Sequence, residues 1–147
     1  MRLVTIRRLT QALGIGVAAF GVLPILAPRR FAALAGFAPP DHGTDEALYR
    51  SVGARDVALG IGILGAASGV GSGAGADGAD GARGEGDRVA LWVLARLLCD
   101  AGDAVALAVA IRRGERDPRL LALTGLAVVA TGYSAVLLGL IRRQRPR

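Results

Sequence analysis

The stretch ARLLCDAGDAVALAV, Ala95–Val109, places three charged side chains within a segment otherwise composed for the interior of a lipid bilayer. These are Arg96, Asp100 and Asp103, and their i, i+4, i+7 spacing puts them on one face of an α-helix. Asp100 is the midpoint of the 23-residue run Val89–Ile111. An isolated charge at such a depth costs about 2.5 to 3.5 kcal/mol. We therefore expect the charged face to point toward other helices and not toward lipid.

The composition favours a membrane protein. Of the 147 residues, 52% are hydrophobic and 4% aromatic, and the mean hydropathy is +0.46. All 18 basic residues are arginine, which we attribute first to GC-rich codons. The formal net charge is +6, but the arginines flank apolar runs instead of forming a solvated face with interleaved aromatics, so no nucleic-acid partner is expected. The lone Cys99 cannot form an intramolecular disulfide.

Two further runs are long enough to cross a bilayer without any charge. Leu9–Ala27 has 19 uncharged residues and Leu120–Ile141 has 22. At about 1.5 Å per residue, the first run nearly spans a hydrocarbon core of about 30 Å, and the second run spans it completely. Asp117 and Pro118 supply an N-cap and a proline at the first helical position, so the last helix has a clear start.

A fourth spanning helix requires buried charge. Val57–Val70 offers only 14 uncharged residues, fewer than the roughly 18 that a spanning helix needs. Thr44, Asp45 and Glu46 form a cap and an acidic first turn that extend it toward the N-terminus. The sequence thus predicts an all-α fold with four transmembrane helices in an antiparallel bundle, at approximately 9–27, 45–70, 89–111 and 118–141.

The chain is expected to form a single integral membrane domain, 1–147, interrupted by a flexible Gly-rich loop at 71–88. Nine arginines flank the predicted helices on the side of the two termini, and six flank them on the other side. This excess favours a topology with both termini in the cytoplasm, in a bacterial inner membrane. A competing interpretation treats Arg2–Ala38 as a secretory signal. Its apolar region is long for a signal, and two further spanning runs follow.

If helices 45–70 and 89–111 form an antiparallel hairpin, residues at the same level have numbers that sum to about 159. Asp103 then lies opposite Asp56 and beside Arg55, which makes Arg55–Asp103 the favoured pair. We predict a neutral intramembrane charge cluster of three arginines and three aspartates: Arg50, Arg55, Arg96, Asp56, Asp100 and Asp103. Small residues should let these two helices approach closely. The expected packing positions are Gly53, Gly60, Gly62, Gly65 and Gly102.

The sequence offers little support for catalysis. Gly60, Gly62 and Gly65 match the dinucleotide fingerprint G-x-G-x-x-G, but no strand precedes them, so we attribute the match to chance. One histidine and one cysteine do not provide a multi-ligand metal site, and the serines lack a positioned base. We therefore expect no catalytic residues, no metal and no cofactor. The enzyme question stays open, with a non-enzymatic role favoured.

Two interpretations of the charges remain open: a buried network that fixes helix register, or a site for a proton, an ion or a polar substrate. The predicted function is a small multi-pass membrane protein with a structural or accessory role. The alternatives are a proton- or ion-coupled transporter or a membrane redox accessory that uses Asp100 or Asp103. Expected partners are the lipid bilayer and either a second copy or an unidentified membrane protein.

The motifs R-x-x-G-A-R-D, Arg50–Asp56, and D-x-x-D, Asp100–Asp103, resemble a bacterial family of small four-helix integral membrane proteins classed as a domain of unknown function. The resemblance implies that Arg50, Gly53, Arg55 and Asp56 are the positions of the first motif, and Asp100 and Asp103 those of the second. Because the family has no settled activity, the resemblance supports the architecture and the choice of residues only.

Overall fold

The computed structural model describes residues 3–38, 40–41, 43–69, 79–114 and 116–143, and the regular structure within them is entirely helical. The all-α prediction is therefore confirmed. Four long helices and one short helix are present in these ranges: α1 (Leu3–Leu26), α2 (Pro28–Ala35), α3 (Gly43–Ala67), α4 (Ala79–Arg112) and α5 (Pro118–Arg143).

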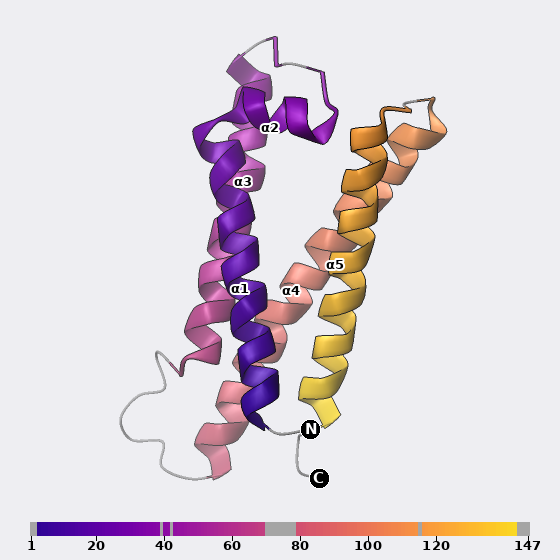
Figure 1. Ribbon diagram of the computed structural model, residues 1–147. Coiled ribbons are helices and arrows are strands. Elements are labelled where there is room, and N and C mark those ends of the chain that lie inside the picture. Colours follow the sequence, from indigo (N-terminus) through magenta and orange to yellow (C-terminus); the bar gives the residue numbers. More distant parts are fainter. Residues whose placement is uncertain (1–2, 39, 42, 70–78, 115, 144–147) are drawn as a thin grey trace.

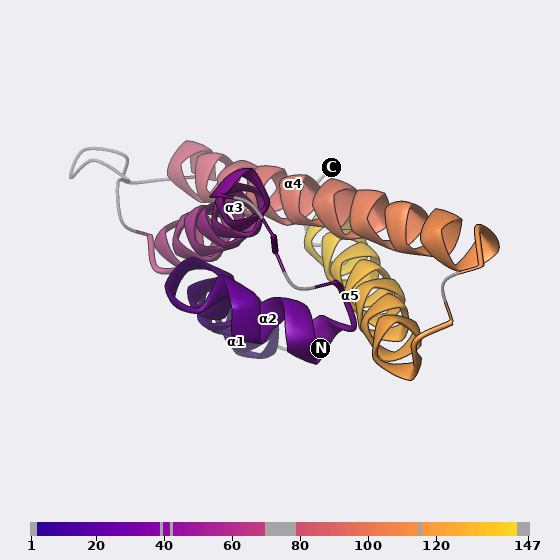
Figure 2. The same cartoon turned by 90° about the horizontal axis from the view of Figure 1, so that it is seen from above.

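The long helices run alternately up and down and form two close pairs, α1 with α3 and α4 with α5 (Figure 1). The pairs lie near each other at the end where α1 begins and α5 ends, and they diverge toward the end that carries α2 (Figure 1). Seen from above, α3 lies between α1 and α4 (Figure 2). The arrangement is thus more open at the end that carries α2 than at the opposite end.

The helices differ from the prediction in three main places. Helix α1 begins at Leu3, six residues before the predicted start at residue 9. Pro28–Ala35, which lies between the predicted helices 9–27 and 45–70, forms the additional helix α2, with a proline in its first turn and Gly36 as its left-handed cap (φ 78°). Helix α4 begins at Ala79, ten residues before the predicted start at residue 89, because extending a helix costs less than nucleating one. The predicted loop 71–88 is therefore helical from Ala79 onward, and 71–78 lie outside the described residues.

Glycines on facing sides allow α1 and α3 to approach until their backbones touch. A Cβ atom added to Gly53 would lie 2.5 Å from the carbonyl oxygen of Gly21, and one on Gly60 would lie 2.6 Å from the backbone nitrogen of Ala18. Gly53 and Gly60 are seven residues apart and so share one helix face. Only glycine fits at such a contact without a shift of one helix, and small residues of this kind are typical of close helix pairs in membranes.

Most of the glycines that were expected to lie between α3 and α4 do not lie there. Gly53 and Gly60 face α1, and only Gly62 meets α4, where an added Cβ would lie 2.5 Å from the ring of Trp92. Gly65 and Gly102 have no heavy atom within 4 Å of an added Cβ. Gly53 and Gly60 therefore pack against α1, whereas the sequence analysis expected them to pack against α4.

The two pairs converge on a hydrophobic core at the end opposite α2. Its side chains come from the first turns of α1, the first half of α4 and the last turns of α5, and Val93 at its centre has no exposed surface. The buried members are Ile6, Ala90, Val93, Leu137, Leu138 and Ile141. This core closes one end of the molecule.

By length and composition, two helices of the described residues can cross a membrane: Val4–Leu26 and Pro118–Arg143. This is fewer than the four spans predicted. Helices α3 and α4 are long enough, but Arg55 and Asp56 in one and Arg96, Asp100 and Asp103 in the other interrupt their apolar character.

Candidate functional site: a charge network beside a cavity

Arg96, near the middle of α4, connects two carboxylates. Its Nε donates to Asp100 Oδ2 at 2.9 Å and its Nη2 donates to Asp100 Oδ1, while its Nη1 lies 3.0 Å from Asp56 Oδ1 on α3. All three residues are buried, with exposed fractions of 8% for Arg96, 2% for Asp100 and 1% for Asp56. The i, i+4 spacing of Arg96 and Asp100 makes their pairing possible within one helix.

Arg55 makes the second connection between the two helices. Its Nη2 and Nη1 donate to the two oxygens of Asp103 on α4 at 2.8 and 3.3 Å. The same guanidinium also contacts Asp56 Oδ1, with Nε at 3.1 Å and Nη2 at 3.0 Å. Asp56 is thus shared by Arg55 and Arg96. We call the five residues Arg55, Asp56, Arg96, Asp100 and Asp103 the charge network.

The register derived from sequence places Arg55 beside Asp103, and the structure contains this pair. Arg50 lies outside the network. It pairs with Glu46 at 3.0 Å, its side chain is half-exposed, and Glu46 also pairs with Arg29. Five residues of helix turn Arg50 about 140° away from Arg55, which explains why both cannot face α4. The network therefore holds two guanidinium groups against three carboxylates, and not three of each.

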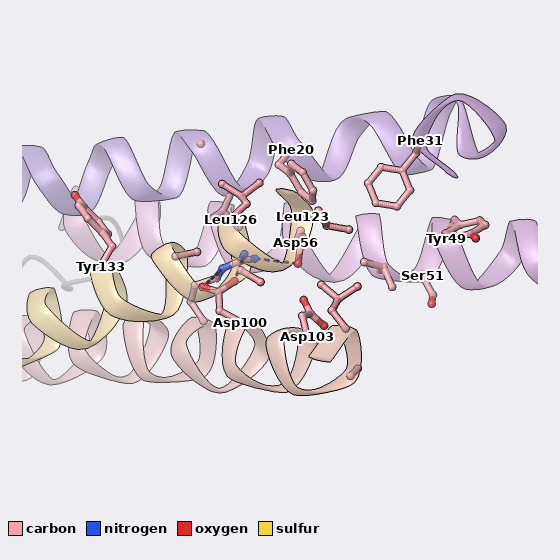
Figure 3. A pocket seen from close by; sticks show the side chains of 18 of the residues that line it. Phe20, Phe31, Tyr49, Ser51, Asp56, Asp100, Asp103, Leu123, Leu126 and Tyr133 are labelled. Atoms are coloured by element: carbon pink, nitrogen blue, oxygen red, sulfur yellow. Dashed lines mark hydrogen bonds and ion pairs between the residues drawn. The ribbon is translucent and has the colours of Figure 1, made fainter. Parts of the chain in front are cut away.

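A cavity of about 760 Å³ lies beside the network (Figure 3). Four network side chains line it, namely Asp56, Arg96, Asp100 and Asp103, and Figure 3 shows Asp103 pointing from α4 toward the space below Phe20. Almost all of the remaining wall is apolar. Alanine and leucine side chains of α1, α4 and α5 contribute much of it, including Ala12, Ala106, Ala127, Ala130, Leu107 and Leu126.

Aromatic side chains surround the end of the cavity near α2. The ring of Phe31 lies 5.9 Å from that of Phe20 and 5.8 Å from that of Tyr49, and the ring of Phe37 lies 5.9 Å from that of Tyr49 (centroid distances). These separations are typical of aromatic pairs in contact. Tyr133 also lines the cavity, and its hydroxyl donates to the carbonyl oxygen of Leu9 at 3.0 Å. Sequence reasoning missed this cluster, because its members are far apart in the chain.

One polar atom of the network takes part in an ion pair without making a hydrogen bond. The Nη1 group of Arg96 is within ion-pair distance of Asp56, but among the described residues it makes no hydrogen bond, since its N–H bonds are not directed at a suitable oxygen. Buried donors are normally paired, and here the attraction between Nη1 and the Asp56 carboxylate takes the place of a well-directed hydrogen bond.

Comparison with known proteins identifies the family but adds no activity. No curated protein and no solved structure matches the chain. A sequence model of one family matches residues 14–140, which include the whole charge network and every cavity-lining residue except Ala12 and Leu13. The resemblance to a domain of unknown function is confirmed, and the chain belongs to the family described as Domain of unknown function (DUF4267).

Proposed function

We propose that this protein is an integral membrane protein in which α1, α3, α4 and α5 all cross the bilayer, with both termini in the cytoplasm. In this proposal the protein is non-enzymatic, and the charge network has an architectural role: it neutralises the charges of α3 and α4 and fixes how these helices pair. We propose that its role in a bacterial inner membrane is structural or accessory.

The observation that carries the proposal is the inverted polarity of α4. Leu91, Leu98 and Val105 follow one another at intervals of seven residues along one face, and their exposed fractions are 65%, 65% and 63%. Arg96 and Asp100 are buried on the opposite side. A helix of a water-soluble protein normally buries its apolar face and exposes its charges. The reverse order is favourable where the surroundings are hydrocarbon.

The contacts of α1 support a retained first helix. Cleavage of α1 as a signal would leave the glycine face of α3 uncovered. In the structure, Gly14 and Gly21 of α1 cover this face, with their backbones in contact with those of Gly60 and Gly53. The small-residue contact is of the kind that joins helices within membranes. We therefore favour α1 as a permanent part of the fold over a secretory signal.

The topology can be tested with single cysteines in a Cys99→Ser background. Ser68→Cys follows α3 and Arg113→Cys follows α4. If all four long helices cross, a membrane-impermeant maleimide should label Arg113→Cys in intact cells and Ser68→Cys only after lysis. If only α1 and α5 cross, both cysteines lie on the same side and both should be labelled in intact cells, which would contradict the proposal.

A second candidate function is proton- or ion-coupled transport through Asp100 or Asp103. It is supported by the side chain of Asp103, which is 41% exposed and lines the cavity. Intramembrane carboxylates with such access are common in proton pathways. In proteoliposomes with a trapped pH indicator, transport predicts a proton flux that Asp103→Asn abolishes while the protein stays folded. Flux no greater than in empty liposomes, or unchanged in Asp103→Asn, would rule this function out.

A further inference from the structure

The cavity collects most of the aromatic side chains of the protein. The chain has three phenylalanines, two tyrosines and one tryptophan. All of them except Trp92 line the cavity: Phe20, Phe31, Phe37, Tyr49 and Tyr133. Phe20, Phe31, Phe37 and Tyr49 contact one another at the end near α2, and Tyr133 lies at the other end of the cavity (Figure 3). The cavity therefore offers aromatic faces at both of its ends.

The charge of the cavity wall is negative. Three carboxylates and one guanidinium of the network line it, and the other lining residues among those described carry no charge. Arg55 pairs with Asp103 and Asp56 without lining the cavity, so the network has two positive and three negative groups and a formal charge of −1. Asp103 is the most accessible carboxylate, since Asp56 and Asp100 are almost completely buried.

We propose that this cavity binds a hydrophobic organic cation, with the charged centre beside Asp103 and the apolar groups among the aromatic side chains. A cation near the Asp103 carboxylate would balance the excess negative charge of the network. Aromatic faces attract organic cations and also pack against hydrocarbon. The volume of about 760 Å³ is typical of a small-molecule site with a mostly apolar wall and a few polar groups.

The inference goes beyond the proposed architecture and does not depend on the number of crossing helices. It depends on the charge excess, the accessible carboxylate and the aromatic lining. A binding experiment therefore tests it separately from the topology experiment: labelling that supports only two crossing helices leaves the cavity proposal intact, and absence of cation binding leaves the four-helix topology intact.

The test compares tetraphenylphosphonium with tetraphenylborate, which have nearly the same size and shape and opposite charge. Binding is measured on the full-length protein in nanodiscs of zwitterionic lipid, after subtraction of binding to protein-free nanodiscs. We expect saturable binding of the cation and an affinity for the anion that is weaker by about tenfold or more. Asp103→Asn should weaken cation binding by about tenfold or more, whereas Asp103→Glu should stay within a few-fold of wild type.

Two further variants distinguish binding inside the cavity from a general effect of the protein's charge. Ala127→Phe fills the cavity without changing any charge and should also abolish saturable cation binding. Asp41→Asn removes an equal charge from a residue that does not line the cavity and should bind like wild type. The thermal unfolding midpoint of each variant is measured first. If Asp103→Asn does not fold, the cation-to-anion ratio of wild type and the result for Ala127→Phe decide the question.

Three results would overturn the proposal: equal affinity for both ions, wild-type cation affinity in folded Asp103→Asn, or an equal loss in Asp41→Asn. Equal affinity for both ions, together with loss of both in Ala127→Phe, would identify a site for hydrocarbon alone, such as a lipid acyl chain.

Discussion

Replacement of Arg96 by methionine is expected to lower the free energy of unfolding by about 3 to 5 kcal/mol, the range found when one partner of a buried ion pair is removed. Methionine has a similar length and preserves the packing of the stem. Asp56 would keep Arg55 as a partner, but Asp100 would remain buried without a cation. Reversible denaturant unfolding in detergent, followed by circular dichroism, measures the loss.

The matched control removes both charges of that pair. In the double variant Arg96→Met/Asp100→Leu no carboxylate is left buried without a partner, because Asp56 still pairs with Arg55. We expect it to recover most of the lost stability, since apolar residues often replace a buried ion pair at little cost. Wild-type stability of the single variant, or a double variant no more stable than the single, would show that Arg96 does not neutralise Asp100.

The second large effect is expected at the contact between α1 and α3. In Gly60→Ala the new Cβ would lie 2.6 Å from both the nitrogen of Ala18 and the carbonyl oxygen of Gly14. These are backbone atoms, so the helices must separate to relieve the overlap, at a cost of about 1 to 3 kcal/mol. Alanine's better helix propensity, about 1 kcal/mol, offsets only part of this. The thermal unfolding midpoint should fall.

Gly65→Ala is the matched control for this substitution, because it lies on the same helix with nothing within 4 Å of the new methyl group. There the helix propensity acts alone, and the midpoint should rise or stay unchanged. A drop of equal size in both variants would mean that the loss comes from α3 itself and not from its contact with α1.

Sequence periodicity predicted those features that depend on one helix at a time. The common face of Arg96, Asp100 and Asp103 follows from 100° per residue, and the level of Arg55 with Asp103 follows from the equal rise of two antiparallel helices. The all-α class and the boundaries of α5 have the same origin: long apolar runs with clear caps.

Features that depend on the choice of neighbour could not be predicted in this way. Gly53 and Gly60 mark a packing face, but spacing alone does not say whether α1 or α4 covers it. Gly14 and Gly21 in α1 have the same separation of seven, and that matching period was the available signal for the α1–α3 pair. The cavity had no comparable signal, since its walls come from all five helices.

The sharing of Asp56 by two arginines limits how the helices can move. Sliding α3 along α4 by one turn, about 5.4 Å, would carry Asp56 away from Arg96 and Arg55 away from Asp103 together, so a piston-like displacement meets a double barrier. Tilting is less restricted: the core around Val93 holds the two pairs together at one end, whereas at the other end the start of α5 meets α2 through an exposed hydrogen bond from Arg119 Nη1 to the carbonyl oxygen of Ala33 at 2.8 Å. We therefore expect the main internal motion of this protein to be a tilt of one helix pair relative to the other, which widens or narrows the space in front of Asp103.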